Sequence, residues 1–95
     1  MTYGKNCRMK MIINYTFKFT RSLKKLSKEE ASKFTKKVSI FELNHSHPLL
    51  KTHKLKGKLK NYWSFSINYS QRVLFIFENE NEVTFIDIGT HRIYK

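Results

Sequence analysis

The sequence predicts an α+β fold in which an antiparallel β-sheet carries two N-terminal helices on one face. Three observations lead to this prediction. Apolar and polar residues alternate in two separate stretches, a helical period of apolar residues lies between them, and the expected order is β-α-α-β-β-β. A chain of 95 residues can form one domain with a modest core. We expect this domain over residues 12–95, preceded by a flexible extension over residues 1–11.

The first expected strand begins at Ile12 and Ile13, and its apolar and polar residues alternate as far as Phe19. Thr20 can then cap a short helix that carries Leu23 and Leu26 on one side.

A second, longer helix is expected to begin at Ser27. Ser27 and Glu30 have the spacing of a capping box, in which each side chain bonds the backbone amide of the other residue. Pro48 disfavours helical conformation in the residue before it, so the helix should end near Asn44. One face of this helix is predicted to carry the apolar residues Ala31, Phe34, Val38 and Phe41.

The last third of the chain is expected to form strands. Apolar and polar residues alternate strictly over residues 63–69. One face of this strand should carry Trp63, Phe65, Ile67 and Tyr69, and the other face Ser64, Ser66 and Asn68. Residues 73–77 are continuously apolar, as expected for a central strand that is covered on both faces. A polar hairpin connection over residues 78–82 leads to the last strand, Val83 to Ile88, and Gly89 begins a short tail or a further pairing.

The charge of the chain favours a polyanionic partner, because the formal net charge is +12. Residues 1–60 contain 16 lysines and arginines against 3 acidic residues, whereas residues 61–95 contain 3 against 4. Five lysines and a histidine lie between Lys51 and Lys60, with Gly57 as the expected turn. This segment is either a surface for nucleic acid or a solvated face.

Cysteine and hydropathy patterns narrow the setting. Cys7 is the only cysteine, which leaves no internal disulfide and fits a reduced, cytoplasmic environment. No apolar stretch approaches the length of a membrane span, so no membrane partner is expected. His45, His47, His53 and Cys7 are irregularly spaced, so we expect no metal site and no cofactor.

Three segments of the sequence have a recognisable pattern. They are HKLKG at residues 53–57, WSFSINYSQRVLF at residues 63–75, and IGTHRIY at residues 88–94. Together they resemble the RelE/ParE superfamily, the toxins of bacterial type II toxin–antitoxin systems, and the first and last are most similar to its YafQ-like branch. The resemblance implies a RelE-like fold and a ribosome-dependent mRNA endonuclease that inhibits translation without a metal. It also implies an antitoxin partner in a hetero-oligomer, besides the ribosome and mRNA.

The chemistry implied by this resemblance is attack of a ribose 2′-OH on the adjacent phosphate, with the 5′ oxygen as leaving group. A base must take the 2′-OH proton and an acid must protonate the leaving oxygen. Histidine suits both tasks, because its ordinary pKa of about 6.5 lies near working pH. Cations must meet the charge that builds up on the phosphate oxygens.

The resemblance assigns these tasks residue by residue. His53 and His91 match the two histidines of the YafQ-like motif, and we expect His53 or a lysine to be the base and His91 the acid. The remaining expected catalytic residues are Lys54 and Lys56 on the phosphate, Arg72 at the start of the central strand, and Tyr94 stacked on a base. The expected RNA-binding residues are Lys51, Lys58, Lys60 and Arg92.

Two positions depart from the pattern. Ser66 stands where active relatives often carry arginine or histidine, and Ser70 stands at the acidic position of the YafQ-like branch. Two alternatives therefore stay open: a ParE-like toxin that inhibits DNA gyrase, and an inactive module that binds only antitoxin or nucleic acid. Arg72 also has a structural alternative, an ion pair with Asp87 across the sheet, and Tyr94 could pack against the sheet edge.

Overall fold

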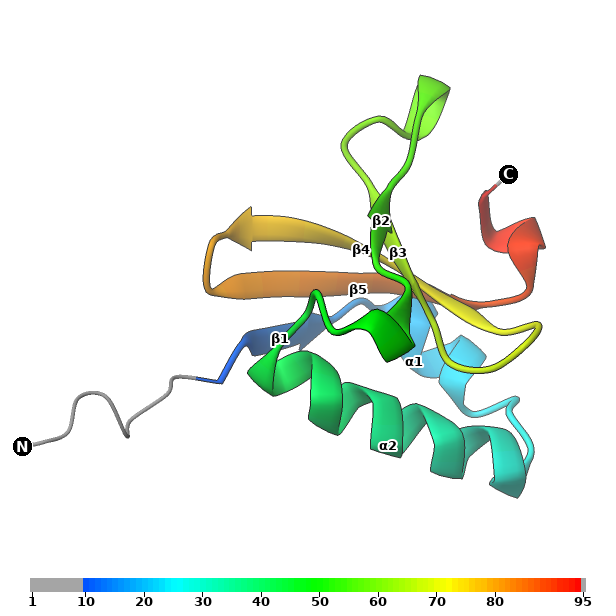
Figure 1. Cartoon of the computed structure of the whole chain (residues 1–95). Helices are drawn as coiled ribbons and strands as arrows, with labels where there is room; N and C mark the ends of the chain where they lie inside the picture. Colours follow the sequence, from blue (N-terminus) through cyan, green and yellow to red (C-terminus); the bar gives the residue numbers. More distant parts are fainter. Residues whose placement is uncertain (1–9, 95) are drawn as a thin grey trace, which may run out of the picture.

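The computed structural model describes residues 10–94 and forms a five-stranded sheet with two helices on one face (Figure 1). Three single-turn 3₁₀ helices, labelled η, lie between or after the strands. The elements in chain order are β1 (Ile12–Tyr15), α1 (Phe17–Leu23), α2 (Lys28–Leu43), η1 (Pro48–Leu50), β2 (His53–Lys54), η2 (Gly57–Leu59), β3 (Trp63–Ser66), β4 (Arg72–Asn79), β5 (Glu82–Gly89) and η3 (His91–Tyr94).

The N-terminal boundary of the fold lies close to the predicted one. Residues 1–9 of the predicted extension, with Cys7, lie outside the described residues. The backbone amide of Met11 donates to the carbonyl oxygen of Glu42 at 2.9 Å, and the Met11 side chain packs against the core. Met11 is therefore attached to the end of α2.

The strand order is β1-β5-β4-β3-β2, and the sheet is mixed. β1 pairs with β5 in parallel, from Ile12 opposite Glu82 to Tyr15 opposite Phe85, and the other pairs are antiparallel. The prediction of a wholly antiparallel sheet is therefore wrong at this edge. The alternation of side chains predicts a strand but carries no information about its direction, and here both helices lie between β1 and the strands that follow.

The first strand is shorter than predicted because Thr16 begins a helix. The Thr16 side chain accepts a hydrogen bond from the Phe19 amide at 2.9 Å, and its hydroxyl donates to the Ile86 carbonyl oxygen at 2.8 Å. The strand predicted as far as Phe19 thus ends at Tyr15, and the predicted cap Thr20 lies inside α1. Phe17 and Phe19 are compatible with a strand and with a helix, and the Thr16 cap favours the helix.

α2 begins and ends where the sequence predicts. The Glu30 amide donates to the Ser27 hydroxyl at 3.1 Å, and the Ser27 amide donates to the Glu30 carboxylate at 3.0 Å, so the capping box is confirmed. Asn44 is the C-terminal cap. Phe34 and Phe41 are buried on the predicted face.

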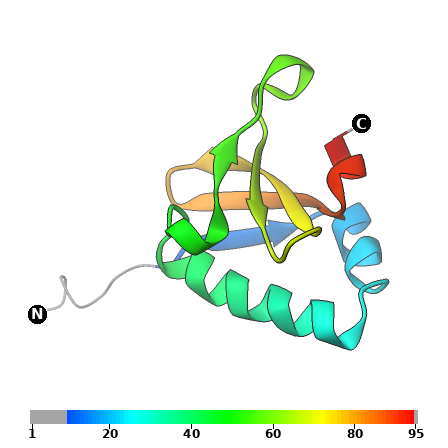
Figure 2. The same cartoon turned by 45° about the vertical axis from the view of Figure 1, so that its right-hand side comes forward.

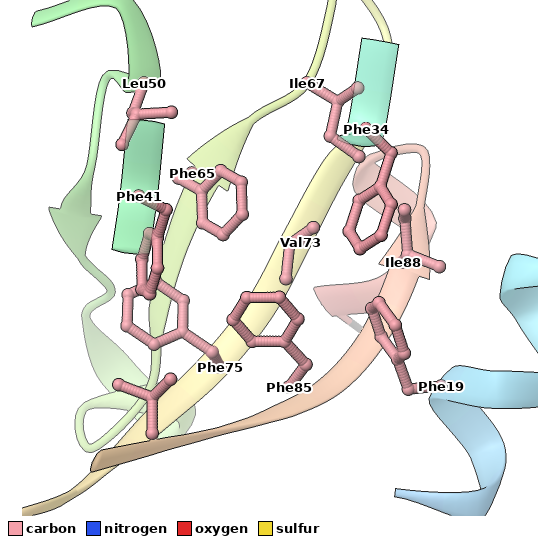
Figure 3. Packing of buried hydrophobic residues seen from close by; sticks show 11 residues of the cluster. Phe19, Phe34, Phe41, Leu50, Phe65, Ile67, Val73, Phe75, Phe85 and Ile88 are labelled. Atoms are coloured by element: carbon pink, nitrogen blue, oxygen red, sulfur yellow. The ribbon is translucent and has the colours of Figure 1, made fainter. Parts of the chain in front are cut away.

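Both helices and the sheet share one core of aromatic rings (Figure 3). The Phe41 ring lies 4.8 Å from that of Phe65 and 5.1 Å from that of Phe75, and the Phe19 and Phe85 rings are 5.4 Å apart. The other members of the buried cluster are Phe34, Leu50, Ile67, Val73, Val83 and Ile88. The prediction of two helices on one face is confirmed.

On the opposite face of the sheet β3 carries the small polar residues Ser64 and Ser66, and η3 lies against part of this face. Leu74 on this face of β4 is buried, as expected for a strand covered on both sides, and η3 contacts both β4 and β5. The tail predicted after Gly89 turns back toward this residue. A Cβ atom on Gly89 would lie only 3.0 Å from the Ile93 side chain, so the close approach favours glycine here.

One side chain predicted on the buried face of β3 lies in solvent. Tyr69 is 99% exposed. The strand ends at Ser66, and the next residues form a turn in which the Asn68 carboxamide oxygen accepts from the amides of Ser70 and Gln71 at 2.9 and 2.7 Å. The turn ends the alternation before Tyr69.

Candidate active site

Apart from Arg72, which begins β4, the predicted site residues come from two parts of the chain that project to the same side. The β2–β3 connection and η3 both rise away from α2, and both views show this arrangement (Figures 1 and 2). Gly57 has a positive φ of 71°, which confirms the turn predicted in this connection.

A row of paired residues links the two parts across the open face. His53 pairs with Ser64 on the neighbouring strand, so the two side chains point to the same face. The Ser64 hydroxyl is buried and forms a 2.6 Å hydrogen bond with the Tyr94 hydroxyl. Ser64 therefore holds the C-terminal segment next to the strand of His53. Lys54 pairs with Trp63 and points to the opposite face.

Arg72 lies in the next row and is held by a serine. Its Nη1 atom donates to the Ser66 hydroxyl at 3.2 Å, and Ser66 is its partner residue in the sheet. The predicted alternative, an ion pair with Asp87, is wrong, because Asp87 pairs with Leu74 in the register. Asp87 instead accepts from the Ser22 hydroxyl at 2.6 Å and lies 3.6 Å from the Lys18 ammonium.

An open groove of about 650 Å³ brings three predicted site residues together, Arg72, His91 and Arg92. We call it the C-terminal groove, and its described lining residues are Tyr69, Ser70, Arg72, Thr90, His91 and Arg92. A second hollow of about 420 Å³, the lysine groove, is lined by Lys37, Leu49, Lys51, Ser66, Asn68, Tyr69 and Arg72. The two grooves share Tyr69 and Arg72, and among residues 10–94 no carboxylate side chain lines either of them.

The other predicted site residues of this region lie on β2 and on the connection to β3. His53 is exposed, and its Nδ1 atom lies 2.9 Å from the Lys51 carbonyl oxygen. A carbonyl oxygen can only accept, so Nδ1 carries a proton in this contact and Nε2 of the neutral ring is left with a lone pair. Three further lysines, Lys56, Lys58 and Lys60, are exposed in or beside η2.

Sequence reasoning missed the parts played by three residues. Ser64 anchors Tyr94, Tyr69 lies between the two grooves, and the Lys37 ammonium donates to the Ile67 carbonyl oxygen at 3.0 Å. The alternation over residues 63–69 does place Ser64 on the polar face. Its partner lies 30 residues away along the chain, and no local pattern reveals it.

The described residues form neither a metal-binding cluster nor a membrane-spanning helix. Over residues 10–94, no three His, Cys, Asp or Glu side chains are grouped so that they could hold a metal ion. None of the described helices is long and apolar enough to cross a membrane.

Comparison with solved structures identifies the same fold in several toxins. The YoeB/ParE toxin from Agrobacterium tumefaciens superposes with a TM-score of 0.72 at 18% identity, over 85% of this chain and 99% of that one. YafQ from E. coli strain BL21(DE3) gives 0.68 at 19%, over 88% and 97%. The toxin–antitoxin complex RelBE2 from Mycobacterium tuberculosis gives 0.71 at 14%, over 86% and 99%.

A comparison with curated protein sequences gives no match. A protein-family description does match, "Bacterial toxin of type II toxin-antitoxin system, YafQ", and it spans residues 11–94. This range contains all five strands, both helices and the groove on the open face. The chain therefore belongs to the YafQ family of bacterial type II toxins.

Proposed function

We propose that this toxin is a ribosome-dependent mRNA endonuclease that inhibits translation. The observation that carries the proposal is the C-terminal groove, where Arg72, His91 and Arg92 line one open surface and the described residues contribute no carboxylate side chain. A surface of this kind suits a phosphodiester, whose negative charge increases in the transition state. Membership of the YafQ family supports this activity over gyrase inhibition.

In the proposed reaction, the ribose 2′ oxygen attacks the adjacent phosphorus while the bond from phosphorus to the 5′ oxygen breaks. The products are a 2′,3′-cyclic phosphate and a free 5′-hydroxyl. His53 takes the 2′-OH proton on Nε2, a role supported by the contact of its Nδ1 atom with Lys51. His91 gives a proton to the leaving oxygen, and Arg72 and Arg92 bind the phosphate oxygens.

Two further residues have proposed positions around the substrate. Tyr94 is hydrogen-bonded to Ser64, and its ring lies beside a base of the mRNA. Lys56 is exposed on the β2–β3 connection and contacts the phosphate backbone. The ribosome orients the mRNA in the A site, which accounts for a groove as open as this one. This proposal places the protein in the cytoplasm.

We also propose that a cognate antitoxin holds the toxin inactive. The RelE–RelB complex from Pyrococcus horikoshii and the E. coli DinJ–YafQ complex have this fold in their toxin chains, with TM-scores of 0.69 and 0.66. An acidic antitoxin segment would complement the net charge of +12.

The test adds purified protein to a translating ribosome reaction and maps mRNA ends by primer extension. We expect cuts within A-site codons, no cuts on the same mRNA without ribosomes, and a loss of about 100-fold or more in His91→Ala. His47→Asn is the matched control, because His47 caps η1 without belonging to the described lining of either groove, and Asn keeps a capping group.

Absence of cuts with translation intact would overturn the proposal. A DNA supercoiling assay would then test gyrase inhibition. Cutting by His91→Ala at the wild-type rate would remove His91 from the mechanism while leaving the nuclease activity in place.

A further inference from the structure

Tyr69 is the most exposed large hydrophobic side chain of the described residues, and a hydrogen-bonded turn carries it. Its exposed fraction is 99%, whereas the next, Phe17, is 78% exposed. The turn that carries it is closed by the Asn68 carboxamide, by the Ile67 amide donating to the Gln71 carbonyl oxygen at 2.9 Å, and by Lys37 bonded to Ile67. The ring is therefore presented to solvent by an ordered turn and not by a loose loop.

Basic residues line both grooves to which Tyr69 belongs. The C-terminal groove contains Arg72, His91 and Arg92. The lysine groove contains Lys37 and Lys51 besides Arg72. Tyr69 lies at the junction, because it is shared by the two linings.

An exposed aromatic ring between cations has the chemistry of a single-strand binding site. Unpaired bases stack on aromatic faces, and the phosphates on either side of the base meet lysine and arginine. An acidic peptide would use the cations but would gain little from an exposed ring. Among the described residues, neither lining includes a carboxylate side chain, which agrees with a ligand that carries regularly spaced negative charges.

We propose that Tyr69 stacks on an unpaired base of the RNA strand that flanks the cut codon, with the strand continuing from the C-terminal groove into the lysine groove. This inference rests on the proposed nuclease function and extends it. It assigns a binding role to Tyr69 and Lys51 outside the reacting groups. The strand would pass from His91 over Tyr69 to Lys51.

The test measures binding in the absence of ribosomes and of cleavage. The probe is a short fluorescent single-stranded RNA with 2′-O-methyl riboses, which lacks the attacking hydroxyl group. Tyr69→Ala should weaken binding by about 5- to 100-fold at low salt, whereas Tyr69→Phe, which keeps the ring, should stay within about twofold of the wild type. Lys51→Gln should reduce the slope of log affinity against log salt by about 0.7.

Phe17→Ala is the matched control. Phe17 is also an exposed ring beside an arginine, with the Arg21 guanidinium 5.6 Å from the ring centre, but it lies on α1. Its removal should leave RNA binding unchanged. Comparable losses in Phe17→Ala and Tyr69→Ala would show non-specific adhesion and overturn the proposal.

Three further results would also overturn it. They are no measurable binding of the probe by the wild type, unchanged affinity for the probe in Tyr69→Ala, and a loss of affinity in Tyr69→Ala that is equally large for a glutamate-rich peptide and for the RNA. The last would identify the surface as a protein-binding site. These outcomes are separable from failure of the proposed function, because mRNA cleavage by the wild type is measured independently of binding to an RNA that cannot be cut.

Discussion

On the helix-covered face of the sheet, phenylalanine rings pack against one another, whereas on the open face hydroxyl groups form side-chain hydrogen bonds. On the first face, Phe41 meets Phe65, Phe75 and Phe85 at ring distances of 4.8 to 5.5 Å. On the second face, the contacts are single hydrogen bonds, from Ser64 to Tyr94 and from Arg72 to Ser66. The buried rings that stabilise the fold and the residues proposed to contact the substrate therefore lie on opposite faces of the same strands.

The small side chains of the open face have a consequence for the site. Ser64, Ser66 and Gly89 leave room for η3 to lie on the sheet, and they leave the Arg72 side chain half-buried and without a carboxylate partner among the described residues. Larger side chains at these positions would fill the space that η3 and a substrate need. Substitutions on the two faces should therefore affect different properties.

The largest expected effect is on the helix-covered face. Phe41→Ala should lower the free energy of unfolding by roughly 3–5 kcal/mol, because it removes a ring that is completely buried among three others. Urea unfolding measures the loss, and Phe17→Ala, at an exposed ring, is the control with an expected change below about 1 kcal/mol. A loss in Phe41→Ala no larger than in the control would contradict the assignment of stability to this face.

On the open face, Arg72→Ala should lower the mRNA cleavage rate by about 100-fold and the unfolding free energy by only about 1 kcal/mol. Arg72→Lys keeps the charge but loses the fork of donors, so an intermediate rate is expected. Ser66→Ala removes only the anchor of the guanidinium and should cost less activity than either. A cleavage rate in Arg72→Ala equal to that of the wild type would exclude contact with the phosphate.

α2 was the part of the fold that the sequence specified best, since both of its signals are local. The Ser27–Glu30 spacing and the Phe34–Phe41 face need only neighbours along the chain. The direction of β1 and the exposure of Tyr69 were missed, because the first depends on a pairing partner 70 residues away and the second on where a turn interrupts β3. Alternation describes a strand but not its limits or its partner.

The candidate site shows the same division. Arg72, His91 and Arg92 were singled out from motifs, and the fold brings them into one groove. Their surroundings were not predictable, since Ser66 and Ser64 act through contacts across the sheet. Ser66 had been noted as a lost catalytic position, and in the structure its hydroxyl supports Arg72.

The third prediction concerns the hydrogen bond between Ser64 and Tyr94, which holds η3 on the open face. Ser64→Ala and Tyr94→Phe should each cost about 1–3 kcal/mol of unfolding free energy, because each leaves a hydroxyl without its partner. The double variant should cost less than the sum of the two, with a coupling of about 1 kcal/mol. Additive losses would mean that the two hydroxyl groups do not stabilise each other.

The last prediction concerns Glu30, which connects α2 to the turn before Arg72 by a hydrogen bond. Its carboxylate accepts from the Ser27 amide, and its second oxygen accepts from the Gln71 carboxamide at 3.1 Å, directly before Arg72. The hydrogen bond from the Ser27 backbone, followed by that from Gln71, lowers the pKa of Glu30 below its ordinary value. A carboxyl group whose pKa is lower in the folded state stabilises the fold above its ordinary pKa of about 4.3, and this contribution is lost as the pH falls through the folded value.

The difference in unfolding free energy between the wild type and Glu30→Gln should therefore be present at neutral pH and shrink on acidification. Urea unfolding across this pH range measures the trend, with Glu29→Gln as the control, because Glu29 lies in the same first turn outside the capping box. The effect is expected to be the smallest of the four, since the group is exposed to solvent and screened. A difference that stays constant with pH would mean that the Glu30 charge does not contribute, and that α2 and the turn before Arg72 are held together by packing alone.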